Sequence, residues 1–168
     1  AELDITWPVS EGAAGLKKAV DALRAAAEKA CDDGVKLIVL TDKAASHARA
    51  AMPSLVATGA VHQHLIRSEK RMDVSLILES AEPRDTHQMA CLFGYGVTAI
   101  CPYLAFQTIG EIFEKDQTVR KPKLSAVTDI TQGLKNYRSA LEKGVLKIMS
   151  KMGISVLNSY QGAQIFEA

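Results

Sequence analysis

Two short aliphatic runs constrain the fold of this chain more than any other feature. Lys36–Leu40 ends in Leu-Ile-Val-Leu, and Val74–Leu78 places the same residue types around one serine. A parallel strand that is covered on both faces has a near-continuous apolar sequence, because neither face meets water. Polar turn residues follow each run, so its length suits a strand better than a helix. We therefore expect two strands of a parallel sheet, the first of them buried on both faces.

Helical patterns alternate with these strands. An apolar stripe from Leu16 to Ala30 predicts a helix that Ser10 can cap and Gly34 can end. The other expected elements are strands at Leu3–Trp7 and Val97–Ile100, helices at Pro53–Leu65, Arg84–Phe93 and Pro102–Ile112, a loop at Asp116–Leu124, and a long helix at Ser125–Met152 broken near Gly133. This alternation predicts an α/β fold of βα units, with a mainly parallel sheet flanked by helices. Four strands are too few to close a barrel, so we expect part of a larger α/β domain.

The composition excludes several classes of protein. The chain has 168 residues, of which 48% are hydrophobic, enough for one globular core and too many for a disordered chain. Its 20 Lys and Arg against 19 Asp and Glu give a net charge of +1, which argues against a dedicated binder of nucleic acid or membrane surfaces. No apolar run reaches the roughly 18 residues of a membrane-spanning helix. We expect a soluble intracellular domain.

The histidines and cysteines show no pattern of a metal site or a catalytic nucleophile. His62 and His64 are two residues apart on an expected helix, so they point in nearly opposite directions and cannot share one ion. We expect one core histidine and one surface histidine. Cys31, Cys91 and Cys101 have no C-x-x-C spacing, which indicates free thiols in a reducing compartment. The residues alone predict no catalytic, cofactor-binding or metal-binding side chain.

Acidic residues follow the two aliphatic strands. Asp42 comes after the first strand, and Glu79 and Glu82 come after the second. Ligands of parallel α/β sheets bind at the carboxyl ends of the strands, so these three carboxylates are candidates for a small-ligand pocket. Polar strand ends occur in every such fold, and an ordinary strand terminus is the competing interpretation.

The last long helix is basic on one face and apolar on another. Residues 115–151 contain nine basic and three acidic residues, a net charge of +6, which leaves −5 for the remainder. Basic residues recur every four positions and apolar residues every three positions, at Lys143, Lys147 and Lys151 and at Leu146, Met149 and Met152. Lys147, Met149, Lys151 and Met152 are therefore candidates for docking against a partner domain. A solvated face beside an ordinary core face is the alternative.

Three stretches resemble the central domain of the large subunit of glutamate synthase. They are PSLVATGAVHQHLI (Pro53–Ile66), VSLILESAEPRDTHQMACLFGYGVTAICPYLAF (Val74–Phe106) and KGVLKIMSKMGISVLNSYQGAQIFEA (Lys143–Ala168). The resemblance covers nearly the whole chain. It assigns residues 1–153 to the C-terminal part of that central domain and residues 154–168 to the start of its junction with the FMN-binding domain. The apolar Ile165 and Phe166 close to the end lead us to expect a piece of a longer chain.

The resemblance implies a large enzyme that makes two glutamates from glutamine, 2-oxoglutarate and a reductant. An amidotransferase domain of that family releases ammonia from glutamine, and a domain with FMN and an iron–sulfur cluster adds it to 2-oxoglutarate. The central domain connects the two and flanks the ammonia tunnel, so this segment is expected to be a scaffold without catalysis or cofactors of its own. The implied partners are these two domains of the same polypeptide and, for the parent enzyme, a reductase subunit or ferredoxin, with no nucleic acid and no membrane.

One alternative remains from the residues themselves. It is a free-standing α/β domain that binds a small ligand through Asp42 and Glu79 without catalysis. The resemblance does not distinguish NADPH, NADH or ferredoxin as the electron donor of the parent enzyme. It implies a cytoplasmic protein, or a protein of the plastid stroma in a photosynthetic eukaryote.

Overall fold

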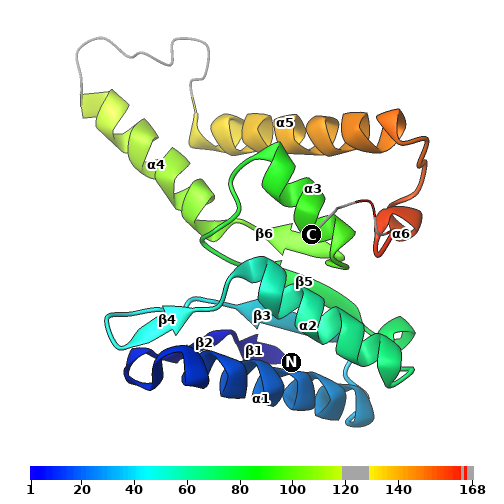
Figure 1. Ribbon diagram of the computed structural model, residues 1–168. Coiled ribbons are helices and arrows are strands. Elements are labelled where there is room, and N and C mark those ends of the chain that lie inside the picture. The colour runs from blue at the N-terminus through cyan, green and yellow to red at the C-terminus, as the bar shows by residue number, and fades with distance from the viewer. Residues whose placement is uncertain (119–128, 164, 166–168) are drawn as a thin grey trace.

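Figure 1 shows the chain in a computed structural model that describes residues 1–118, 129–163 and 165. The strands of this part are β1 (Glu2–Asp4), β2 (Thr6–Pro8), β3 (Leu37–Thr41), β4 (Arg49–Ala51), β5 (Ser75–Glu79) and β6 (Ala99–Cys101). The α-helices are α1 (Gly12–Asp32), α2 (Ser54–Arg67), α3 (Thr86–Gly94), α4 (Tyr103–Thr118), α5 (Ile130–Lys151) and α6 (Leu157–Tyr160). Two short 3₁₀ turns are η1 (Val9–Glu11) and η2 (Arg71–Asp73).

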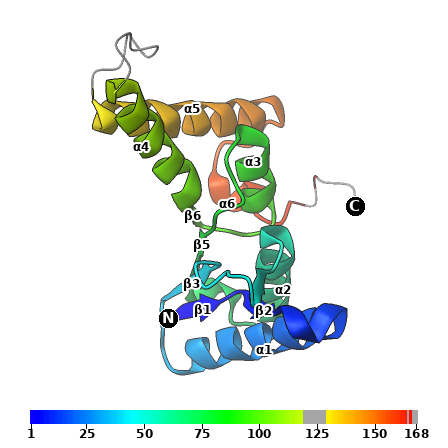
Figure 2. The same cartoon turned by 90° about the vertical axis from the view of Figure 1, so that its left-hand side faces the viewer.

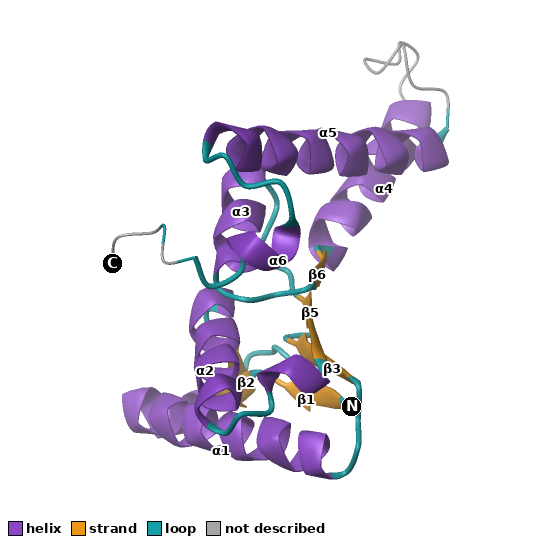
Figure 3. Cartoon of the chain, turned by 90° about the vertical axis from the view of Figure 1, so that its right-hand side faces the viewer, coloured by secondary structure: helices purple, strands orange, loops and turns teal. Residues whose placement is uncertain are grey.

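A four-stranded parallel sheet confirms the predicted α/β fold. Its strands lie in the order β1, β3, β5 and β6, so each pairs with the next strand of the βα alternation. Helices α1, α2 and α3 make the three crossovers. When strands are added in sequence order with crossovers of one hand, successive helices lie on the same face of the sheet. Figures 2 and 3 show α1 and α2 together on one side of β1, β3 and β5.

The face of the sheet under the helices is the main core. Ile38 and Leu40 of β3 and Leu76 and Leu78 of β5 are all 0% exposed. They share one hydrophobic cluster with residues of α1, α2 and α3, namely Leu23, Ala27, Ala30, Ala57, Val61, Leu65 and Leu92. The apolar stripe predicted on the first helix is thus confirmed as the part of α1 that contacts the core.

The opposite face of the sheet bears no helix from the part of the chain that the structure describes (Figure 2). Because side chains alternate along a strand, this face carries Leu37 and Val39 of β3, Ile77 of β5 and Ala99 of β6. Leu37 is 56% exposed, Ala99 is exposed, and Val39 and Ile77 are partly exposed. We call these four residues the open face. The expectation of burial on both faces is therefore wrong for the described residues, because they supply helices to one face only.

The strand expected at Leu3–Trp7 is divided between two sheets. β1 pairs in parallel with β3, whereas β2 pairs antiparallel with β4 in a separate two-stranded sheet. Ile5 lies at the division and is 0% exposed. Its N–H donates to the Thr41 carbonyl, and its own carbonyl accepts from the Met52 N–H. Buried pairing to both sides of Ile5 explains why one apolar run serves two sheets.

The first helix starts later than expected. Ser10 lies in η1 and α1 begins at Gly12, so the predicted capping by Ser10 is wrong. Glu11 occupies the position before the helix and makes no capping bond through its side chain. Gly12 has φ = +54°, a backbone conformation that glycine adopts without a steric penalty and that fits this turn between η1 and α1.

The boundaries of α4 and α5 also differ from expectation. α4 continues to Thr118, so the predicted start of the loop at Asp116 is wrong. The rest of the predicted loop lies outside the described residues. α5 begins at Ile130, and the Asp129 carboxylate caps it by accepting from the Thr131 N–H at 2.8 Å. The helix is unbroken after that, so the break predicted near Gly133 is wrong. A Cβ at Gly133 would lie 2.9 Å from the Phe113 ring, which explains a glycine here through close packing.

A second, smaller core joins α3, α5 and α6. Its buried members are Met89, Val145, Met149 and Tyr160. After α5 the chain turns back, and the Gly162 N–H donates to the Gly94 carbonyl at 2.9 Å. Figure 1 shows α5 lying across the end of α3, with α6 beside both. None of the helices in the described ranges is long and apolar enough to cross a membrane.

Candidate functional site

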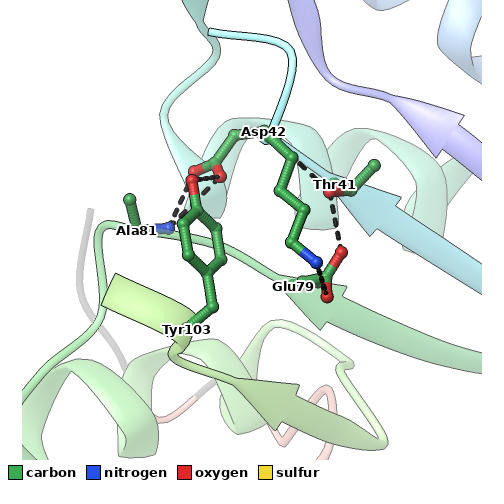
Figure 4. A network of polar contacts seen from close by, with 6 residues as sticks. Thr41, Asp42, Glu79, Ala81 and Tyr103 are labelled. Carbon is green, nitrogen blue, oxygen red and sulfur yellow. Dashed lines mark hydrogen bonds and ion pairs between the residues drawn. The ribbon is translucent and has the colours of Figure 1, made fainter. Parts of the chain in front are cut away.

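The carboxyl ends of β3 and β5 bring the predicted acidic residues to one edge of the sheet. Thr41 pairs with Glu79 in the register of the two strands, so Asp42 lies next to the turn that follows β5. Asp42 is only 3% exposed. Figure 4 shows its carboxylate facing Ala81 and Tyr103, while Glu79 faces Thr41. The register of β3 and β5 thus brings Asp42 and Glu79 to the same edge of the sheet.

The Asp42 carboxylate accepts from three donors, which belong to two segments of the chain. It accepts from the Ser80 hydroxyl at 2.6 Å, from the Tyr103 hydroxyl at 2.8 Å and from the Ala81 N–H at 3.0 Å. A buried carboxylate is stable only when hydrogen bonds or an opposite charge replace water, and this one has three such donors. Asp42 therefore ties the end of β3 to the end of β5 and to the first turn of α4.

Burial and the adjoining Asp42 carboxylate raise the pKa of Tyr103 to about 12. The phenol is protonated at physiological pH and donates its proton to Asp42. It is thus a fixed hydrogen-bond donor in this network and is unsuited to a role as a general base near neutral pH.

Glu79 is paired at the outer side of the same strand ends. Its carboxylate accepts from the Lys43 ammonium at 2.6 Å and from the Thr41 hydroxyl at 3.0 Å. The hydrogen bond from Lys43 lowers the pKa of Glu79, and the Thr41 hydroxyl adds to this effect. The Lys43 ammonium also lies 5.6 Å from the centre of the Tyr103 ring. Glu79 is therefore ionised and neutralised within the chain.

Glu82 lies farther along and serves the start of α2. Its carboxylate accepts from the Ser54 N–H at 2.7 Å, where a negative charge is favourable at the N-terminus of a helix. The Ser54 and Ser80 hydroxyls are 2.9 Å apart and connect this contact to Asp42. Glu82 also borders a shallow cavity of about 280 Å³ that includes Cys91 and His87 of α3.

The hydrogen bonds at the strand ends connect β3 and β5 to each other and to the first turns of α2 and α4. Each of the three predicted carboxylates already accepts a hydrogen bond from a group of the same chain, and that of Asp42 is also buried. Within the described ranges, no group of three or more His, Cys, Asp and Glu could hold a metal ion. The geometry supports the simpler interpretation, a polar strand terminus that fixes the register of the sheet and the start of two helices.

The docking candidates divide between surface and core. Lys147 and Lys151 are exposed, and so are the apolar Met152 at 44% and Leu146 at 60%. Met149 is 4% exposed and packs with Met89, Val145 and Tyr160 in the second core. We call the exposed set (Leu146, Lys147, Lys151 and Met152) the α5 surface. Met149 packs beneath this surface, and its side chain is too buried to contact a partner.

The interpretation of the two histidines is confirmed. His62 is 7% exposed and its Nδ1 accepts from the Arg71 guanidinium at 2.9 Å. His64 is partly exposed, and its Nε2 lies 2.8 Å from the Glu28 carboxylate. The desolvation that accompanies burial lowers the pKa of His62, with a smaller effect from Arg71. His62 is thus a neutral core residue that connects α2 to η2.

Arg71 is a structural residue that the sequence pattern did not reveal. Besides His62, its guanidinium donates to the Val74 carbonyl at 2.8 Å and to the Gly96 carbonyl at 2.7 Å. Gly96 has φ = +103°, and a Cβ there would lie 2.1 Å from the His62 ring. The glycine is required twice, by its backbone conformation and by the ring beside it. A lone arginine after a helix gives no signal in sequence that it will bind His62 and Gly96, which are nine and 25 residues away.

The three cysteines are separate in the fold. Cys31 lies on α1, Cys91 on α3 and Cys101 at the end of β6, and all three are free thiols. Partial burial raises the pKa of each thiol. A raised pKa disfavours the thiolate that metal binding and nucleophilic attack require. The positions of the cysteines therefore do not fit a cluster-binding or catalytic role.

Comparison with known proteins gives a family match over the full chain. The sequence model of the glutamate synthase central domain matches residues 1–168. Glutamate synthase [NADH] of Schizosaccharomyces pombe is 43% identical over 168 residues, which are all of this chain and 8% of that protein. The large chain of glutamate synthase [NADPH] of Azospirillum brasilense is 44% identical over 168 residues, all of this chain and 11% of its own length. The chloroplastic ferredoxin-dependent glutamate synthase of Spinacia oleracea is 46% identical over 171 residues, 98% of this chain and 10% of its own. The chain spans about a tenth of the length of these relatives.

Proposed function

Since this chain belongs to the glutamate synthase central domain family, we propose that it is a connecting segment of a glutamate synthase. The parent polypeptide would form two glutamates from glutamine, 2-oxoglutarate and a reductant. In this proposal the segment holds the amidotransferase and FMN domains in register beside the path of ammonia. It contributes no catalytic group itself.

The observation that carries the proposal is the match over residues 1–168 to a family of central domains, together with a polar network that is satisfied internally. A catalytic site keeps reactive groups available to a substrate. The carboxylates of the acidic cluster in this chain instead accept hydrogen bonds from neighbouring strands and helices. This arrangement favours the scaffold over the small-ligand-binding alternative.

The FMN and the iron–sulfur cluster of a parent glutamate synthase would be bound outside this segment. Cys31, Cys91 and Cys101 lie on three different elements with raised pKa values, so they do not fit a cluster. Their dispersal supports a division of labour in which other parts of the polypeptide carry the redox groups.

We also infer that the segment serves a step that is common to all electron donors. Relatives named for NADH, NADPH and ferredoxin are 43%, 44% and 46% identical to it. Recognition of a particular donor would be expected to favour one group of relatives. Near-equal identity instead supports a role in joining domains. The chloroplastic relatives and the others together fit either the cytoplasm or the plastid stroma as the compartment.

We assign residues 1–153 to the C-terminal part of the central domain and residues 154–168 to the start of the junction with the FMN domain. Gly153 supports this boundary, since its φ of +70° ends α5 with a left-handed residue. Beyond it, Tyr160 is fully buried against the second core. The α5 surface lies next to this boundary and is the part of the segment that we propose contacts the FMN domain.

The test of this function uses the full-length parent enzyme and the variant Lys147→Glu, Lys151→Glu. Reversing two exposed charges should weaken docking of the α5 surface and allow ammonia to escape. The expected result is more than one glutamine hydrolysed per 2-oxoglutarate consumed. The matched control is Lys17→Glu, Lys18→Glu, which reverses two exposed charges on α1. A ratio of one in both variants would overturn the proposed role of the α5 surface.

A further inference from the structure

The centre of the open face is apolar, and its border is polar. In the sheet register, Val39, Ile77 and Ala99 form one row across β3, β5 and β6, and Leu37 lies next to this row on β3. The same side of the sheet carries polar residues at its edges, namely Glu2, Asp4, Thr41, Ser75 and Glu79. A parallel strand with one solvated face would alternate apolar and polar residues, and Leu37–Leu40 of β3 does not.

The exposed side of α1 differs from the open face. Several of its positions carry charge, as at Lys17, Asp21 and Lys29, and its exposed apolar residues are small alanines such as Ala25. The open face instead presents Val39 and Ile77 in one row, where no helix of the described residues covers them. This difference favours a cover over the open face in the complete protein.

The carboxyl-end border of the open face is neutralised within the chain. Glu79 is paired with Lys43, and Asp4 accepts from the Arg49 guanidinium at 2.7 Å. Glu2 lies at the outer end of the Val39 row, on the edge strand β1, where it is exposed. The complementary surface is therefore aliphatic over β3, β5 and β6 and leaves Glu2 at its rim.

We propose that the open face is buried against aliphatic side chains of another segment of the same parent polypeptide. This inference rests on the proposed function, which places the chain in a much longer protein. About nine-tenths of the length of the relatives lies outside the matched part, so ample chain exists to form such a layer. The occupant is a layer of the same molecule, and the interface holds the four-stranded sheet within a larger domain.

The experiment compares two alanine-to-cysteine variants of the full-length parent enzyme. Ala99→Cys places a thiol on the open face, and the control Ala25→Cys places one on the exposed side of α1, four residues from Asp21 and from Lys29. Each native protein is treated with N-ethylmaleimide, and peptide mass spectrometry reads each labelled position separately from the natural cysteines. The expected result is labelling at least about tenfold slower at position 99 than at position 25, and equal rates after unfolding.

Two results would overturn the proposal. Equal labelling of the two native variants would show that the open face meets water. Protection at position 99 that disappears on dilution, together with a change from dimer to monomer, would show that a second copy covers the face. Coupled glutamate formation by the same Ala99→Cys enzyme would leave the proposed function standing in either case, so the two failures can be told apart.

Discussion

Strand β3 carries aliphatic side chains toward both faces of the four-stranded sheet, and the two faces differ in their surroundings. Ile38 and Leu40 point under α1 and α2 and are fully buried. Leu37 and Val39, which alternate with them along β3, point to the face that no described helix covers. Apolar residues on both sides of a parallel strand are typical of a sheet that is covered on both faces, and the described residues supply helices to one face.

A lysine at Ile77 tests this comparison with the largest expected effect. In the full-length parent, Ile77→Lys would bury an unpaired charge and lower the free energy of unfolding by about 3–5 kcal/mol. Ile66→Lys, on the exposed side of α2, should change it by less than about 0.5 kcal/mol. Denaturant unfolding of both variants is the measurement. Equal tolerance of the two lysines would mean that the open face is solvated.

An alanine at Leu76 sharpens the other side of the comparison. Leu76 is fully buried beneath the helices, so Leu76→Ala should cost about 2–5 kcal/mol through lost burial and a cavity. Native-state hydrogen exchange of the β5 amides in the full-length protein reads this loss directly. The cost should be larger than that of Ile77→Ala in the same strand. A smaller cost for Leu76→Ala would contradict the assignment of the main core.

The Asp42 network gives a smaller effect with a defined pH dependence. Tyr103→Phe removes one hydrogen bond to Asp42 and should cost about 1 kcal/mol at neutral pH. The folded protein raises the pKa of Tyr103 from 10 to about 12, so this contribution is complete below pH 10 and is lost as the pH rises through 12. Stabilities of the wild type and the variant should therefore converge over that interval. A constant difference between pH 9 and pH 12 would contradict this origin.

The ion pair of Lys43 and Glu79, at the edge of the open face, should have the smallest effect on stability. The hydrogen bond from Lys43 lowers the pKa of Glu79 below its ordinary value of 4.5. The pair stabilises the fold above that pH, and the contribution disappears as the pH falls through the lowered pKa. Lys43→Met should thus weaken the protein slightly at pH 7 and not at pH 3. Lys36→Met, at the other end of β3, is the control and should show no such pH dependence.

Sequence patterns predicted the elements that depend on local periodicity. The aliphatic runs gave β3 and β5, and the apolar stripe gave α1, because burial leaves a repeat of two or 3.6 residues. The division of the first strand at Ile5 left no such mark, since its N–H and carbonyl bond to Thr41 and Met52, which are distant in sequence. β4 is likewise a three-residue strand that exists only through its pairing with β2.

The sequence predicted where the candidate site lies, but not whether its carboxylates are already hydrogen-bonded within the chain. Parallel strands in register explain why Asp42 and Glu79 meet at one edge. Whether a carboxylate is free or saturated depends on donors such as Tyr103, 61 residues away in the chain. The same limit applies to Met149, whose burial depends on contacts with Met89 and Tyr160. Helical spacing places Met149 on a face, and only the fold shows which face meets the core.

Hydroxyl-radical footprinting of the unmodified full-length protein tests the central claim most directly. Leu37 and Ile66 are aliphatic residues with similar exposure in this chain, 56% and 46%. Leu37 lies on the open face, and Ile66 lies on α2. If another segment of the parent covers the open face, oxidation of Leu37 should be several-fold slower than oxidation of Ile66. Oxidation of both residues at comparable rates would contradict the account.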